Sequence, residues 1–312
     1  MKKHHSFRFS VIILYLLAFC MIFTGCGSSS KAKNASSDEP PSFSTFQVLV
    51  PEAPAKKLLG SSPLTLDISN INQGYFVAQS DSADTQMNLQ ISTPTQTTYS
   101  YFISPGEQAV IPFSEGDGDY IITAYQQIEG DQYAALYSET VSITLDNEFL
   151  PFLYPNQYVN FSSESLAVQK AYSLVTVGET DLEILKEIYN FIIKNITYDY
   201  DKAESVSSGY LPNIDETLTS GTGICFDYAA LTAAMLRSCD IPCKLQIGYS
   251  GDIKHAWIDV YIKSEGWIEN AVSFDGDTWT LLDPTFESTS DDSEAIQEYI
   301  GDETNYSVQF TR

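Results

Sequence analysis

The sequence is short of histidine, cysteine and basic residues. Its 312 residues include three histidines and five cysteines, and 16 lysines and arginines stand against 41 acidic residues, which gives a net charge of −25. A surface this acidic repels phosphate backbones, so nucleic acid is not an expected partner. No cysteine lies between positions 27 and 224, so the first half has no disulfide framework. No internal repeat is visible.

The apolar segment near the start, residues 11–23, is too short to span a bilayer as a mature helix. It follows a basic stretch and ends in Phe23-Thr24-Gly25-Cys26, which resembles a bacterial lipoprotein signal. An ordinary secretory signal with a chance cysteine is the alternative. The lipoprotein interpretation implies that residues 1–25 are removed and that Cys26 is lipidated. The protein would then be anchored to the cell membrane on its extracytoplasmic face.

The next part of the chain is divided into a linker and a β-rich region. Residues 27–42, GSSSKAKNASSDEPPS, are small and polar, so we expect a flexible linker over 26–45. Between 46 and 148, short runs rich in β-branched and aromatic residues, such as 65–68 and 88–91, are separated by turn clusters. Short strands at this spacing predict an all-β sandwich, of the immunoglobulin-like kind.

One turn cluster, Glu115-Gly116-Asp117-Gly118-Asp119, gathers oxygen ligands that would suit calcium. It lacks the full loop pattern and the distal glutamate of a helix–loop–helix calcium site. We therefore interpret it as a solvated hairpin turn, and we expect no metal and no cofactor.

After Pro155 the pattern changes from strands to helices. Apolar residues recur at three- and four-residue spacing over 181–196, and Thr180 with Glu183 forms a capping box before them. Helices are also expected over 163–175 and 225–237, a loop over 200–223, and strands over 244–249, 256–262, 267–272 and 278–282. This order predicts an α+β domain over residues 155–312, with helices packed on an antiparallel sheet.

Cys225 and His255 have the chemistry of a thiol catalytic pair. Glycines precede Cys225, which opens a predicted helix, and the unsatisfied N–H groups of a helix N-terminus favour the nucleophilic thiolate. His255 is the sole histidine outside the predicted signal, and imidazole can hold and return a proton near neutral pH. Asp283, at the end of a predicted strand that could pair with the histidine strand, would orient the imidazole.

Each of these residues taken alone has a structural alternative. A lone histidine is more often structural than catalytic, and a single aspartate is more often a solvated loop residue. A structural role suits Cys239 and Cys243 better than Cys225, because those two flank Ile241-Pro242, where a helix must turn into a strand. The catalytic interpretation therefore depends on the set of three.

The same residues resemble the transglutaminase-like superfamily over about residues 189–287. The matching stretches are Asn195-Ile196-Thr197-Tyr198-Asp199, GTGICFDYAALTAAMLRSCDIPCKLQIGY (221–249), His255-Ala256-Trp257 and Trp279 to Thr285. The resemblance implies a papain-like fold and thiol chemistry on acyl groups, with Cys225 as nucleophile, His255 as acid and base, and Asp283 as the orienting residue. It also implies an oxyanion held by backbone N–H groups and an upstream donor, for which Tyr198 is the candidate; a packing role is the alternative.

One position departs from the family pattern. Many relatives have Asn-Glu after the tryptophan of the histidine strand, where this chain has Ile258-Asp259. Those positions lie off the triad, so the departure bears on substrate contacts more than on the reaction.

Three functions follow as hypotheses. The first is a membrane-tethered thiol enzyme that hydrolyses peptide or amide bonds in an extracellular protein or a cell-wall peptide. The second is a protein-crosslinking transglutaminase, which would need a cleft that admits an amine and delays water. The third is a non-catalytic surface binding protein.

Overall fold

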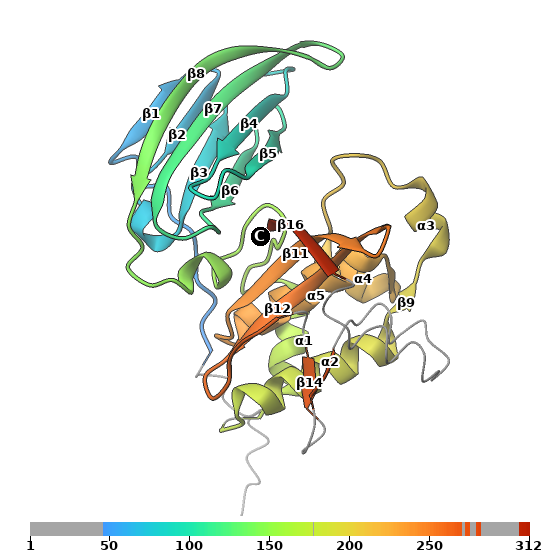
Figure 1. Cartoon of the computed structure of the whole chain (residues 1–312). Coiled ribbons are helices and arrows are strands. Elements are labelled where there is room, and N and C mark those ends of the chain that lie inside the picture. Colours follow the sequence, from blue (N-terminus) through green and yellow to red (C-terminus); the bar gives the residue numbers. More distant parts are fainter. Residues whose placement is uncertain (1–45, 177, 270–271, 275–278, 282–305) are drawn as a thin grey trace, which may run out of the picture. The chain divides into compact units, whose positions relative to one another are not determined.

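The structure, a computed structural model, describes residues 46–312 apart from positions 177, 270–271, 275–278 and 282–305. Its β-rich part consists of two four-stranded antiparallel sheets, with strand orders β1-β2-β3-β6 and β5-β4-β7-β8 (Figure 1). The strands are β1 Leu58–Ser61, β2 Leu64–Asp67, β3 Tyr75–Ser80, β4 Met87–Ser92, β5 Thr98–Ile103, β6 Gln108–Pro112, β7 Gly118–Glu129 and β8 Gln132–Ile143.

Alternation along the strands explains why these sheets face each other. In β5, Tyr99, Tyr101 and Ile103 are buried while the residues between them are exposed, the pattern of a strand with one face on a core. Leu66 and Phe76 of the other sheet belong to the same apolar cluster. The predicted all-β sandwich is therefore confirmed for this part of the chain.

The acidic turn before β7 is held by donors of the protein. The Tyr99 hydroxyl donates to Glu115, and the Leu145 backbone N–H donates to Asp117 Oδ1 at 2.8 Å. The run links β6 of one sheet to β7 of the other, so the interpretation as a hairpin turn is wrong: these two strands do not pair with each other.

The second part of the chain contains the helices and a further four-stranded antiparallel sheet of order β13-β12-β11-β16. The helices are α1 Leu166–Leu174, α2 Asp181–Asn195, α3 Tyr200–Ser205, α4 Ile214–Ser220 and α5 Cys225–Ser238, with short 3₁₀ helices η1 Ile71–Gln73 and η2 Leu150–Phe152. The strands are β9 Thr197–Tyr198, β10 Thr222–Gly223, β11 Cys243–Ser250, β12 Ile253–Ile262, β13 Gly266–Ile268, β14 Val272–Phe274, β15 Trp279–Leu281 and β16 Tyr306–Thr311.

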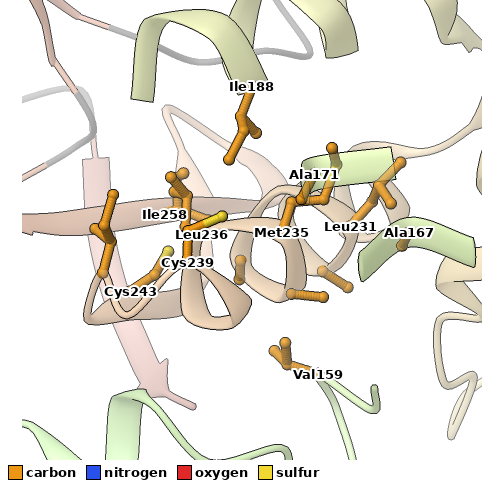
Figure 2. Close-up of a cluster of buried hydrophobic side chains, with 14 of the residues drawn as sticks. Val159, Ala167, Ala171, Ile188, Leu231, Met235, Leu236, Cys239, Cys243 and Ile258 are labelled. Atoms are coloured by element: carbon orange, nitrogen blue, oxygen red, sulfur yellow. The ribbon is translucent and has the colours of Figure 1, made fainter. Parts of the chain in front are cut away.

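Helix α5 is the centre of the second apolar core. Every residue from Asp227 to Ser238 is buried, because α1, α2 and α4 pack on it from one side and β11 and β12 from the other. Figure 2 shows Leu231 and Met235 of α5 beside Ala171 of α1, and Leu236 beside Ile258 of β12. Helices on an antiparallel sheet confirm the predicted α+β class.

Cys239 and Cys243 lie in this core, as expected for structural cysteines (Figure 2). Burial raises the pKa of each thiol to about 12. Both are therefore protonated and unreactive at neutral pH.

The long helices were predicted from the sequence to within a few residues, whereas the short helices α3 and α4 were not predicted. The capping box of Thr180 and Glu183 is present at the start of α2. Helix α1 starts three residues after the predicted position 163, with Ser165 as its N-cap. The prediction of a loop over 200–223 is wrong, because α3 and α4 form there, capped by the side chains of Asp199 and Asn213.

The last strand, β16, joins both parts of the chain. It pairs with β11 across a bulge at Gly248, where a side chain would collide with the backbone of Ser307. Thr311 accepts a hydrogen bond from Ser114 Oγ at 2.7 Å and donates its N–H to the Tyr99 hydroxyl at 3.2 Å. The described residues from 46 to 312 accordingly belong to one compact unit; the limits 46–148 and 155–312 of the two domains stay predictions.

Among the described residues, the structure contains no helix with the length and apolarity to cross a bilayer. Cys26, the signal at 1–25 and the whole linker at 26–45 lie outside the described residues. Their assignments stay predictions.

Arg237, in the last turn of α5, fastens that helix to three other segments. Its Nε donates to Cys243 O at 2.9 Å, Nη1 to Tyr154 O at 3.0 Å and Nη2 to Arg312 O at 2.9 Å. The side chain is 2% exposed, and this burial lowers the pKa of Arg237 to about 10. The guanidinium stays charged at neutral pH, and the carbonyl groups compensate its burial.

We expect Arg237→Met to lower the free energy of unfolding by about 3 kcal/mol or more, because three carbonyl groups lose their donor in the interior. Urea denaturation followed by circular dichroism measures the change. The control is Lys194→Met, at an exposed position in the last turn of α2, which should change stability by less than about 0.5 kcal/mol. Equal stability of the two variants would contradict this role for Arg237.

Candidate functional site

Cys225 is the first residue of α5, as the sequence predicts. Gly221 ends α4 in the left-handed region with φ +67°, a backbone conformation that glycine adopts without strain. The chain then passes through β10 and reaches Ile224, the extended N-cap residue of α5. Cys225 has a free, half-buried thiol. Its sulfur therefore belongs to the residue that opens a 14-residue helix, where backbone N–H groups have no intrahelical partner.

The carboxylate of Asp227 fixes the start of this helix. Asp227 is completely buried, and its Oδ2 accepts the backbone N–H of Ile224 at 2.9 Å. Gly223 is required here, because a Cβ at that position would lie 2.8 Å from the Cβ of Asp227. An acidic side chain in the first helical turn that reaches back to the N-cap amide closes the turn around Cys225.

Two further side chains bind the same carboxylate. Tyr210 donates its hydroxyl to Asp227 Oδ1 at 2.5 Å, and Lys202 Nζ lies 2.7 Å from Oδ2. Lys202 also donates to the Tyr210 hydroxyl at 2.7 Å. Burial and the hydrogen bond to Asp227 raise the pKa of Tyr210 to about 12. Partial burial lowers the pKa of Lys202, but the bonds to Asp227 and Tyr210 outweigh it and the net shift is upward.

His255 is the third residue of β12, which begins three residues before the predicted position 256. Its side chain is 6% exposed and stacks with Trp257, with 6.2 Å between ring centroids and 19° between planes. Gly248 of β11 is its cross-strand partner. The neighbouring Ala256 belongs to the core that α5 fills. The structure thus brings together α5 and β12, the two elements that supply Cys225 and His255.

A short parallel ladder places Tyr198 beside the segment that precedes Cys225. Its partner in that ladder is Gly223, two residues before Cys225. The N–H of Asp199 donates to Gly223 O at 2.9 Å, and the Tyr198 ring packs edge-on against Tyr200 at 4.9 Å. The structure therefore places Tyr198 beside the segment that leads into α5, where either a donor role or a packing role is compatible with its contacts.

Two aspartates that follow His255 in the chain, Asp283 and Asp259, were considered in the sequence analysis. Asp283 lies outside the described residues. The strand before it, β15, pairs with β14, whereas the histidine strand pairs with β11 and β13 in the part of the chain that is described. Asp259, at the position that departs from the family pattern, is buried and accepts Gln246 Nε2 at 2.5 Å. That contact ties β12 to β11, so Asp259 has a structural role.

A pocket of about 330 Å³ lies along β6, between residues 48–51 and 155–162. Asn156 lines it with a side chain that is 3% exposed, and the amide Nδ2 has no hydrogen-bond partner among the described residues. Leu211, next to Tyr210, closes one side. Cys225 and His255 are not part of this lining.

Sequence reasoning overlooked Asp227, Lys202 and Tyr210. A signal existed for Asp227, because an acidic residue at the third position of a helix is typical of capping. Nothing marked Lys202 or Tyr210, which lie 25 and 17 residues before Asp227 in a segment expected to be a loop. Only the fold of α3 and the chain after it bring them to α5.

Residues 169–284 match the family model of the transglutaminase-like superfamily. The UPF0252 protein MJ1282 of Methanocaldococcus jannaschii is 32% identical over 77 residues, which cover 23% of this chain and 22% of that protein. The chain thus matches about a fifth of the length of this curated relative.

Among solved structures, the chain is similar to a putative cysteine protease from Cytophaga hutchinsonii, with 18% identity, a TM-score of 0.35, and coverage of 68% of this chain and 74% of that chain. It is also similar to the periplasmic domain of TgpA from Pseudomonas aeruginosa, with 13% identity, a TM-score of 0.34, and coverage of 78% and 98%. The family match therefore shows that residues 169–284 of this chain are similar to the transglutaminase-like superfamily.

Proposed function

We propose that this protein is a thiol hydrolase of peptide or amide bonds, with Cys225 as nucleophile, His255 as acid and base, and Asp283 as the residue that orients His255. The superfamily contains both peptidases and transglutaminases. The observation that carries the proposal is a free, half-buried thiol at the first residue of α5, a helix that packs on the strand with the buried His255. A helix N-terminus stabilises a thiolate, and an imidazole supplies the proton transfers that acyl chemistry needs.

The proposed reaction has two halves. The thiolate of Cys225 attacks the carbonyl carbon, and the C–N bond of the tetrahedral intermediate breaks as the imidazolium of His255 gives its proton to the leaving amine. Water then attacks the thioester carbon and gives a proton to His255, and the C–S bond breaks to release the acid and restore the thiolate. Backbone N–H groups of the first turn of α5 would hold the oxyanion in both halves, with the Tyr198 hydroxyl as a further candidate donor.

The geometry around Cys225 suits this role. Asp227 already accepts the N–H of Ile224, so the first turn is rigid before substrate arrives. The N–H groups that follow in the first turn need no partner within the helix and are the natural donors to an oxyanion. Preorganised donors of this kind lower the barrier because they need no rearrangement during the reaction.

We expect Cys225→Ala to abolish turnover, and His255→Ala to lower kcat by about 10³-fold because the proton transfers lose their carrier. Asp283→Asn should retain a small part of the activity, since it keeps a side chain beside the imidazole but loses the charge. The matched control is Lys254→Ala, an exposed neighbour of His255 on β12. Near-full activity of His255→Ala would show that His255 is not the catalytic base.

Amine transfer would use the same acyl-enzyme as hydrolysis. The two reactions differ in the nucleophile that attacks the acyl-enzyme, which is an amine in one and water in the other. We expect water to prevail: with a peptide substrate in ¹⁸O water, the released carboxylate should carry the label, and millimolar amine should divert only a minor part of the product. Mass spectrometry of the products measures both. A majority of amide product at low amine concentration would instead establish a transglutaminase.

We also propose that the enzyme works at the outer face of the cell membrane, tethered through lipid on Cys26. The sequence Phe23-Thr24-Gly25-Cys26 after an apolar segment supports this location. We expect cells fed an alkyne fatty acid to label the protein, and Cys26→Ser to release it unlabelled from the membrane fraction. Labelling that persists in Cys26→Ser, or membrane retention without any label, would exclude this anchor.

A further inference from the structure

The first turn of α5 contains a carboxylate two residues after the proposed nucleophile. Asp227 follows Cys225 by two residues and is completely buried. Asp227 accepts the backbone N–H of Ile224, so the start of α5 needs a hydrogen-bond acceptor at position 227. A buried carboxylate is costly unless it is paired, and a negative charge near a thiol disfavours the thiolate. The group that orients the nucleophile would therefore also oppose its ionisation.

Lys202 supplies the compensating charge. Its ammonium lies 2.7 Å from Asp227 Oδ2, and its side chain is 30% exposed. It also lies 4.7 Å from the centre of the Tyr210 ring, whose hydroxyl donates to Asp227 Oδ1. Both carboxylate oxygens thus have donors, one of them cationic, and the pair carries no net charge.

The fold holds Lys202 in this position independently of the ion pair. Asp199 caps α3 by accepting the Lys202 N–H at 2.9 Å, and its own N–H donates to Gly223 O. The helix that carries the lysine is therefore hydrogen-bonded to the segment immediately before Cys225.

We propose that Lys202, with Tyr210, neutralises Asp227, so that the carboxylate can fix Cys225 at the start of α5 without suppressing its thiolate. Lys202, Tyr210 and Asp227 are positioning residues, and the inference rests on the proposed function of Cys225. It also predicts that the importance of Lys202 disappears when Asp227 is made neutral.

Other titratable groups occur on the surrounding elements. Tyr198 stands on β9, Asp199 at the start of α3 and His255 on β12. None of the variants below changes these groups, so differences between the variants report the charge on Lys202 and Asp227.

The test is the rate constant for iodoacetamide alkylation of Cys225 in the full chain, measured by mass spectrometry from pH 6 to pH 10. We expect Lys202→Met to lower the rate at pH 7 roughly tenfold and to approach the wild-type rate at pH 10, where the thiolate forms in every variant. Adding Asp227→Asn to Lys202→Met should restore the rate at pH 7 to within about threefold of wild type. A structural role alone predicts that the double variant is at least as impaired as the single one.

Two further variants control for folding and for loss of a lysine. Lys202→Arg keeps the charge and should keep the rate at pH 7 within about threefold. Lys170→Met removes a half-buried lysine that lies over the Phe191 ring at 4.9 Å, far along the chain from Cys225, and should leave the rate unchanged. Equal rates for Lys202→Met and Lys202→Arg, or a double variant no faster than Lys202→Met, would overturn the inference.

Failure of the proposed function gives a different result. Wild-type Cys225 would then react no faster at pH 7 than a cysteine in the urea-unfolded chain. Fast wild-type alkylation that Lys202→Met does not slow would reject only the role of Lys202.

Discussion

The hydrogen bond from the Ile224 amide to the buried carboxylate of Asp227 is the constraint on which the site depends. It determines where α5 begins and therefore where the sulfur of Cys225 lies. Gly223 leaves room for the Asp227 carboxylate beside the backbone. Lys202 and Tyr210 form the remaining contacts of the two carboxylate oxygens. Cys225 is thus positioned by a side chain from its own helix and by two residues from upstream segments.

The rest of the fold supports that helix from all sides. The alanines of α5 are buried between the preceding helices and the sheet of β11 and β12. Arg237 fastens the far end of the helix to three backbone carbonyls. Because both ends of α5 are held by buried polar groups, the helix has little freedom to move relative to β12 and the histidine on it.

Much of this could be predicted from the sequence where the signal was local. The periodicity of residues 181–196, the capping box at Thr180 and the Gly-x-Cys start of α5 depend on neighbouring residues, and they were confirmed. The ion pair between Lys202 and Asp227 could not be predicted, because it depends on how α3 and the residues after it return to α5. Strand β16 was missed for the same reason: it is stable only beside β11.

The central claim is that Cys225 forms a covalent acyl intermediate, and rapid acid quenching tests it most directly. The full chain would be mixed with an activated ester of a short peptide, quenched within the first turnover and analysed by intact and peptide mass spectrometry. The account predicts an added acyl mass located on Cys225, which accumulates in a burst and decays in water. Product formation with no adduct on Cys225, or an adduct on another residue, would contradict it.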